Sequence, residues 1–141
     1  MRSILLASLI FSAAAAQAAS IDSAQQALAA VEQAGYQSPH DLEYKYGYWT
    51  VEATTPNGVH ADVLIDPQSG ELLVFESMSA ALPPAQVVEK LSAAGYERIR
   101  DMEFDDGFWE AEARNPQGIK VELVLHPLTG EVLLEEIDQH D

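Results

Sequence analysis

The sequence contains no cysteine, which excludes disulfide bonds, thiolate nucleophiles and cysteine-ligated metal centres. Burial of apolar side chains must therefore supply the stability of the fold. Positive charge is also scarce, because seven Lys and Arg residues face 23 Asp and Glu residues, for a formal net charge of -16. Such a chain repels phosphate backbones and anionic lipid, which argues against nucleic acids and membrane surfaces as partners.

The apolar segment at the N-terminus is short. Arg2 precedes an apolar stretch at 4–11 and a run of small residues at 13–19, and about eight apolar residues cannot span a bilayer that needs about 20. The pattern is typical of a secretory signal peptide. We predict that residues 1–18 are cleaved after Ala18, which leaves a periplasmic or secreted chain with no stable membrane insertion.

The chain aligns with itself, without a gap, at a shift of 60 residues. Five motifs of the first half recur 60 residues later. Ala34-Gly35-Tyr36 aligns with Ala94-Gly95-Tyr96, Gly47-x-Trp49 with Gly107-x-Trp109, and Glu52-Ala53 with Glu112-Ala113. Pro56-x-Gly58 aligns with Pro116-x-Gly118, and Pro67-x-x-Gly70-Glu71 with Pro127-x-x-Gly130-Glu131. Self-similarity of this kind indicates repeated structural units. We therefore predict two units of one design, at residues 19–79 and 80–141.

Each unit predicts one helix followed by four short strands. Apolar residues recur at helical spacing in 24–34 and 84–94, and Gly35 and Gly95 stand where a left-handed residue ends a helix. The strands alternate apolar and charged residues, which is typical of antiparallel sheets with one buried face. The predicted fold class is α+β, with a helix covering one face of a four-stranded antiparallel sheet in each unit.

Turn residues set the expected strand pairing. Asp106-Gly107 suits a two-residue hairpin that pairs Phe104 with Trp109. The Pro-x-Gly segments are expected to form three-residue loops, because an odd loop keeps Ala113 and Val121 on one face. The last strand of each unit, at 71–76 and 131–137, carries apolar residues on both faces, so the pattern assigns neither face to the core.

Several of these motifs together resemble the PepSY domain family. They are Gly-Tyr after a helix, an acidic strand ending in Asp-Gly or Tyr-Gly, Trp-x-x-Glu-Ala, and a Pro-x-[Ser/Thr]-Gly-Glu turn: Gly95-Tyr96, Asp106-Gly107, Trp109 to Ala113 and Pro127 to Glu131, with their counterparts 60 residues earlier. The resemblance implies a tandem PepSY-domain protein of the bacterial envelope. It also implies a role in restraining peptidases and brings no catalytic motif.

Carboxylates gather on the outer face of the predicted sheets. The expected registers place Glu52 opposite Asp62, Glu112 opposite Glu122, Glu103 opposite Glu110, and Asp101 opposite Glu112. Like charges opposite one another destabilise a sheet by roughly 0.2–1 kcal/mol per pair. Three interpretations stay open: a solvated face screened by salt, a surface that binds a basic protein, and a site for a calcium-like cation.

Two aromatic residues, Tyr48 and Phe108, stand beside the hairpin turns on the same acidic side. Exposed aromatic side chains often anchor interfaces, and an alternative is that the rings lie flat on neighbouring sheet atoms. With the six carboxylates Glu52, Asp62, Glu103, Glu110, Glu112 and Glu122, these two residues make up the predicted partner-binding surface.

Signals of catalysis or metal binding are missing. No serine lies in a Gly-x-Ser-x-Gly elbow, and residues 101–107 lack the glycine that a calcium loop needs at its sixth position. Three histidines align with other residue types in the opposite unit and lack zinc-finger spacing: His40, His60 and His126. We predict no enzyme activity, no cofactor and no metal ligand.

The predicted function is that of a non-catalytic envelope protein that binds and restrains another protein, such as a peptidase, or a basic protein surface. The alternative is a divalent-cation (calcium) sensor or buffer of the envelope. The oligomeric state stays open.

Overall fold

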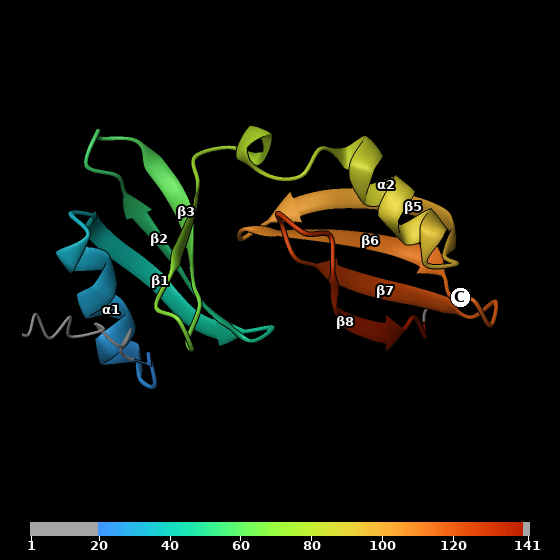
Figure 1. Cartoon of the computed structure of the whole chain (residues 1–141), viewed down its shortest axis with the longest axis horizontal. Helices are drawn as coiled ribbons and strands as arrows, with labels where there is room; N and C mark the ends of the chain where they lie inside the picture. Colours follow the sequence, from blue (N-terminus) through green and yellow to red (C-terminus); the bar gives the residue numbers. More distant parts are fainter. Residues whose placement is uncertain (1–19, 140–141) are drawn as a thin grey trace, which may run out of the picture.

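The computed structural model describes residues 20–139, which form two helices and two four-stranded antiparallel sheets (Figure 1). The N-terminal unit, residues 20–79, contains α1 (Ala24–Gln33), β1 (Gln37–Lys45), β2 (Tyr48–Thr54), β3 (His60–Ile65) and β4 (Leu72–Phe75). The short 3-10 helix η1 (Met78–Ala80) spans the boundary between the two units. The C-terminal unit, residues 80–139, contains α2 (Pro84–Ala93), β5 (Glu97–Asp105), β6 (Phe108–Arg114), β7 (Lys120–Leu125) and β8 (Val132–Ile137).

The predicted signal peptide, residues 1–18, lies outside the described residues. Within residues 20–139, no helix is both long and apolar enough to cross a membrane.

Strands that follow one another in the chain also lie next to one another in each sheet, in the orders β1-β2-β3-β4 and β5-β6-β7-β8. The predicted helix and four antiparallel strands are therefore present in both halves.

The helix ends follow from the local sequence. The Ser23 hydroxyl accepts the backbone N–H of Gln26 at 3.2 Å and so caps α1. The second helix begins at Pro84, where the missing N–H of proline removes no helical hydrogen bond. Gly35 and Gly95 follow the helices with φ of 89° and 93°, the left-handed conformation that glycine adopts without strain. The expectation that Gly35 and Gly95 end the two helices is confirmed.

One face of each sheet is buried beneath its helix. In the N-terminal unit, Ala27 and Val31 of α1 pack against apolar residues of β2 and β3, including Val51, Val63 and Ile65. In the C-terminal unit, Val87 and Leu91 of α2 pack against the corresponding set, which includes Ala111, Ala113, Val121, Leu123 and Leu125. Burial of this apolar surface is the main source of stability in a chain without disulfides.

The predicted turns are confirmed. Asp106 and Gly107 have φ of 50° and 85°, so the turn between β5 and β6 contains two left-handed residues and pairs Phe104 with Trp109. The loop after β6 closes with hydrogen bonds between Asn115 and the residues near Gly118, and Ala113 pairs with Val121.

One predicted register is wrong. Arg100, and not Asp101, lies opposite Glu112. The pairing of β5 with β6 shifts at two places, and Arg98 and Asp101 have positive φ of 53° and 51° beside those shifts. Bulges insert extra residues into a strand and so break the period-two alternation on which the prediction rested.

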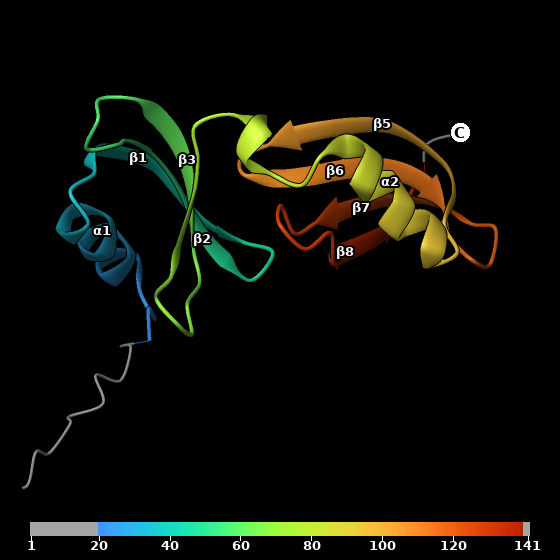
Figure 2. The same ribbon diagram turned by 45° about the horizontal axis from the view of Figure 1, so that its top comes forward.

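The two units pack together through their first hairpins (Figure 2). The tip of the β1–β2 hairpin places Tyr46 and Tyr48 against Phe108, with ring centroids 5.1 and 6.1 Å apart. The tip of the β5–β6 hairpin lies on the outer face of β3, because a Cβ on Gly107 would come within 2.9 Å of Leu64 Cδ2. Each hairpin thus reaches the other unit.

Candidate functional site

Four of the predicted carboxylates lie together in a hollow on the outer face of the second sheet. The hollow has a volume of about 290 Å³ and is called the C-terminal hollow below. Its polar lining consists of carboxylates and one phenol: Asp101, Glu103, Glu110, Glu112, Glu122, Glu136 and Tyr46. The predicted opposition of Glu103 to Glu110 and of Glu112 to Glu122 is confirmed.

Strand register explains why these side chains converge. Glu112 of β6 pairs with Glu122 of β7, and Glu122 pairs with Glu136 of β8. Directly paired residues project to the same side of a sheet, so three carboxylates form a row across three strands. Arg100 of β5 ends the row, with its Nε 3.0 Å from Glu112 Oε2.

Apolar surface also lines the hollow, and both units contribute side chains to it. Val124 and Leu134 form part of its floor, and Tyr46 extends from the β1–β2 hairpin of the N-terminal unit. The tyrosine ring contacts Phe108 edge-on. The hollow therefore depends on the packing of the two units, although most of its charge belongs to the second sheet.

Burial acts on the charge of Glu110. Partial burial raises the pKa of this carboxyl above its ordinary value of 4.5, and the nearby carboxylates of Asp105 and Glu103 raise the pKa further. Burial, followed by the charge of Glu110, also raises the pKa of the Tyr46 phenol. The hollow thus disfavours added negative charge and favours any group that brings positive charge.

The other two predicted carboxylates lie in a separate hollow on the first sheet, called the N-terminal hollow below. Glu52 pairs with Asp62 as predicted, and the hollow, of about 190 Å³, also contains Asp41, Glu43 and Asp106. Burial raises the pKa of Asp62, and the charge of Asp106, which comes from the other unit, adds to this effect. The predicted acidic residues therefore form two sites and not one continuous surface.

Two histidines lie beside Glu52, although their sequence spacing gave no signal. His40 Nδ1 is 3.5 Å from Glu52 Oε2, and His60 Nε2 is 3.5 Å from Glu52 Oε1. These side chains come from three different strands, so a search for helical or zinc-finger spacing misses them. The signal that could have found them is the strand register, because a pairing of β1 with β2 that includes the two register shifts of β1 places His40 opposite Glu52.

Of the two interpretations left open for Phe108, the exposed interface anchor is wrong. Its side chain is 1 % exposed and belongs to the apolar core of the C-terminal unit, where Tyr46 and Tyr48 cover it. Tyr48 is half-buried and also contacts the His126 ring edge-on, at 5.7 Å between centroids. Both aromatic residues hold the two units together within the chain, and this is why neither lies open on the acidic surface.

Several contributors to the two hollows were not predicted from the sequence. Glu136 was missed because β8 carries apolar residues on both faces. Tyr46 and Asp106 were missed because each reaches the other unit from a turn. A register shift between Val124 and Leu125 sets the orientation of β8, and it places Leu134 and Glu136 on the acidic face.

A comparison with known protein families finds a match in the C-terminal part of the chain. Residues 75–136 match the family model described as "Peptidase propeptide and YPEB domain", so a PepSY_2 domain is found in the C-terminal part of the chain. PepSY domains occur in extracellular and envelope proteins and are generally non-catalytic domains of the propeptide or inhibitor type. No curated protein matches the chain.

One similar solved structure is the YpmB protein from Bacillus subtilis, with 12% sequence identity and a TM-score of 0.45. The match covers 83% of this chain and 98% of that chain.

Proposed function

We propose that this protein is a non-catalytic regulator of the bacterial envelope that binds another envelope protein, most concretely a peptidase, and restrains it by covering its surface. The C-terminal hollow would receive a basic side chain of the partner. In this proposal the N-terminal unit is a second, diverged PepSY-like domain, which the matching sheet orders and turn positions support.

The observation that carries the proposal is the row Glu112–Glu122–Glu136 with Glu103 and Glu110 beside it. Paired like charges cost folding free energy, and Arg100 offsets the charge of Glu112 at one end of the row. A lysine or arginine side chain entering the hollow would compensate the remaining carboxylates with charge-assisted hydrogen bonds. Its aliphatic stem would lie against Val124, Leu134 and Tyr46.

Capture of the partner tests the proposal. The chain would be immobilised and exposed to an envelope extract of its source bacterium at low salt, and the retained protein would be assayed for peptidase activity with and without added chain. We expect a retained peptidase whose activity falls when the chain is added. Electrostatic attraction between the surfaces also predicts release at high salt.

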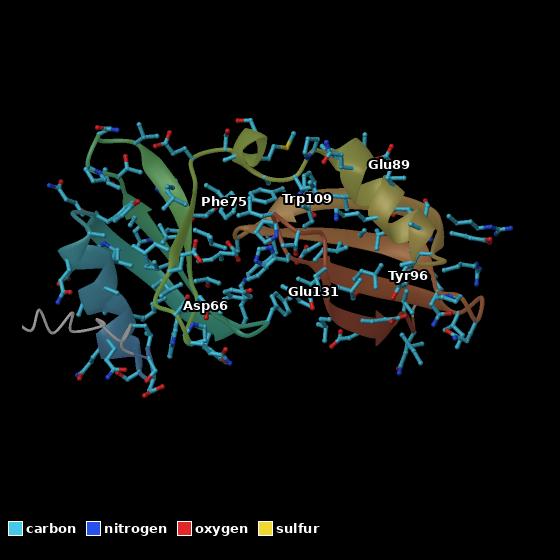
Figure 3. The ribbon with its side chains drawn as sticks, in the orientation of Figure 1. Asp66, Phe75, Glu89, Tyr96, Trp109 and Glu131 are labelled. Carbon is cyan, nitrogen blue, oxygen red and sulfur yellow. The ribbon has the colours of Figure 1, made fainter. Side chains whose placement is uncertain are left out.

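A charge-reversal pair gives the matched comparison. Glu110→Lys with Glu122→Lys changes the C-terminal hollow, whereas Glu32→Lys with Glu89→Lys makes the same charge change on the exposed sides of α1 and α2 (Figure 3 shows Glu89). The hollow pair is expected to abolish capture and inhibition, and the helix pair to leave both close to the original level. Equal losses in the two variants would show a nonspecific charge effect and would contradict the proposal.

A second candidate function is a divalent-cation sensor or buffer. The oxygens of Glu112, Glu122 and Asp138 lie within 4.8 Å of one another, and carboxylate oxygens are the ligands that Ca²⁺ prefers. Lys120 Nζ already lies 2.5 Å from Asp138 Oδ2, so a cation must displace this ion pair. Binding predicts a rise in Tm with added calcium, and an unchanged Tm at millimolar Ca²⁺ would contradict this candidate.

A further inference from the structure

The geometry points to a binding site for one Zn²⁺-class transition-metal ion on the outer face of the first sheet, at Glu52, His40 and His60. Asp41 and Asp62 lie beside these three residues as additional carboxylate ligands. The site belongs to the N-terminal unit and does not use the C-terminal hollow. It is therefore independent of the proposed partner binding.

The strand registers position the donors. Glu52 is central on β2, with His40 opposite it on β1 and Asp62 opposite it on β3. His60 lies two residues before Asp62 and therefore projects to the same side of the sheet. The two imidazole rings are stacked, with centroids 6.0 Å apart.

The separations of the two imidazoles from Glu52 suit a metal ion better than they suit hydrogen bonds, whereas His40 Nδ1 also lies at hydrogen-bond distance from Asp41 Oδ2, at 3.1 Å. His40 Nδ1 and His60 Nε2 each lie 3.5 Å from a different oxygen of Glu52, which is long for a hydrogen bond between nitrogen and oxygen. Ligands about 2.1 Å from a tetrahedral ion are about 3.4 Å from one another. His40 and His60 fall in separate groups of donor atoms within 4.8 Å, so the half-exposed imidazoles must move toward each other for both to bind one ion.

Two overlapping groups of donors share Glu52. His40, Asp41 and Glu52 form one, and Glu52, His60 and Asp62 form the other, each with ligand atoms within 4.8 Å of one another. In the first group a carboxylate oxygen of Asp41 lies within 4.8 Å of one of Glu52, so a single cation could lie between the two negative charges.

The C-terminal unit carries carboxylates at the matching positions, but basic residues stand in the place of the histidines. Glu112 and Glu122 stand at the positions of Glu52 and Asp62, but Arg100 and Lys120 replace His40 and His60. Arg100 neutralises Glu112 through a permanent charge at 3.0 Å, and guanidinium and ammonium groups cannot ligate a metal. At the two matching positions the N-terminal unit carries imidazoles in place of permanent cations, and imidazoles are ligands for zinc, copper and nickel rather than calcium.

The test is a titration of the tag-free full chain with ZnCl₂, followed by calorimetry and by NMR of the histidine side chains. We expect one equivalent to bind, with the imidazole signals of His40 and His60 shifting together. Replacing both residues by their counterparts, His40→Arg with His60→Lys, preserves the fold because the C-terminal unit carries these residues. Loss of a group that only orients a ligand already weakens metal binding about 10–100-fold, so this double change should weaken it by at least about 100-fold.

His126→Asp serves as the control, because it also removes a histidine and introduces the residue found at the matching position, Asp66. Zinc affinity should be unchanged in this variant. The proposal is overturned if the full chain binds no zinc, if His40→Arg with His60→Lys binds it as tightly as the original chain, or if zinc shifts the His126 signal instead. Circular dichroism of each variant verifies that the fold is retained.

Discussion

The outer faces of the two sheets begin from the same pattern and differ in how their negative charge is compensated. Across the first sheet the row is His40, Glu52 and Asp62, and across the second it is Arg100, Glu112, Glu122 and Glu136. At neutral pH the second row has a permanent cation at its end, and the first has groups that gain charge only by binding a proton or a metal. The two sheets thus share a strand arrangement and differ in the side chains on their outer faces.

The hairpin tips show the same divergence. Tyr48 and Phe108 occupy matching positions and contact each other at 6.1 Å between ring centroids, yet Phe108 is 1 % exposed and Tyr48 is half-buried. Lys45 reaches across the same junction, with its Nζ 2.6 Å from Asp106 Oδ2. Apolar packing and one ion pair therefore fix the relation of the units, and the acidic hollows lie beside this junction.

Removing the ring of Phe108 should have the largest effect on this arrangement. Phe108→Ala leaves a cavity between the two units and is expected to lower the free energy of unfolding by about 3–5 kcal/mol. Urea unfolding followed by tryptophan fluorescence measures the loss. Tyr48→Ala, at the matching position, should lose clearly less because its ring is only half-buried; an equal loss would contradict the asymmetry described here.

The two turn glycines give the next largest contrast. Gly47 and Gly107 both have φ of 85°, so alanine at either position costs about 1–2 kcal/mol of backbone strain. At Gly107 the new Cβ would also lie 2.9 Å from Leu64 Cδ2, whereas nothing lies within 4 Å at Gly47. Since Leu64 is fully buried, Gly107→Ala should cost about 1–3 kcal/mol more. Thermal unfolding compares the two variants, and equal Tm values would show that the hairpin does not lie on Leu64.

A pH effect should distinguish the second sheet, because Glu110 stands where the first has Thr50. The raised pKa of Glu110 means that the folded chain binds its proton more tightly than the unfolded chain does. The stability from this proton is complete below pH 4.5, the ordinary value, and is lost as pH rises through the higher pKa of the folded state. Glu110→Gln should therefore raise Tm at pH 7 and leave it unchanged below pH 4.5. A variant that lowers Tm at pH 7 would contradict the cost assigned to this charge.

Exchanging the cations between the rows should have the smallest effect. Because the side chains are exposed, Arg100→His should lower stability, and His40→Arg should raise it, by about 0.2–1 kcal/mol at neutral pH in the absence of metal. Chemical unfolding at low and high salt is the measurement. The differences should shrink as salt increases, and differences that persist at high salt would point to packing instead of charge.

The sequence predicted the parts of the structure that follow from local rules. Helix positions follow from apolar spacing and from Ser23, Pro84 and the glycines, and the strand pairs Glu52–Asp62 and Glu112–Glu122 follow from alternation and loop length. Prediction failed where a strand departs from period two. The bulges in β5 moved Arg100 into the position expected for Asp101.

The candidate sites were predicted only in part, for a physical reason. The alternation of residues in the sequence predicted which carboxylates share the outer face of each sheet, and the strand pairs Glu52–Asp62 and Glu112–Glu122 agree with it. The contribution of Tyr46, the burial of Phe108 and the approach of Asp106 to the first sheet depend on how the two units dock. Docking rests on shape complementarity between distant surfaces, which neither composition nor periodicity records.

The central claim, that the C-terminal hollow binds a basic group of a protein partner, is tested most directly by the salt dependence of the dissociation constant for the captured partner. The account predicts that raising NaCl from about 50 mM to about 500 mM weakens binding of the unmodified chain and of Glu32→Lys with Glu89→Lys, because added salt screens exposed charges. It predicts no measurable binding for Glu110→Lys with Glu122→Lys. A dissociation constant that is independent of salt and unchanged by the hollow variant would contradict the claim.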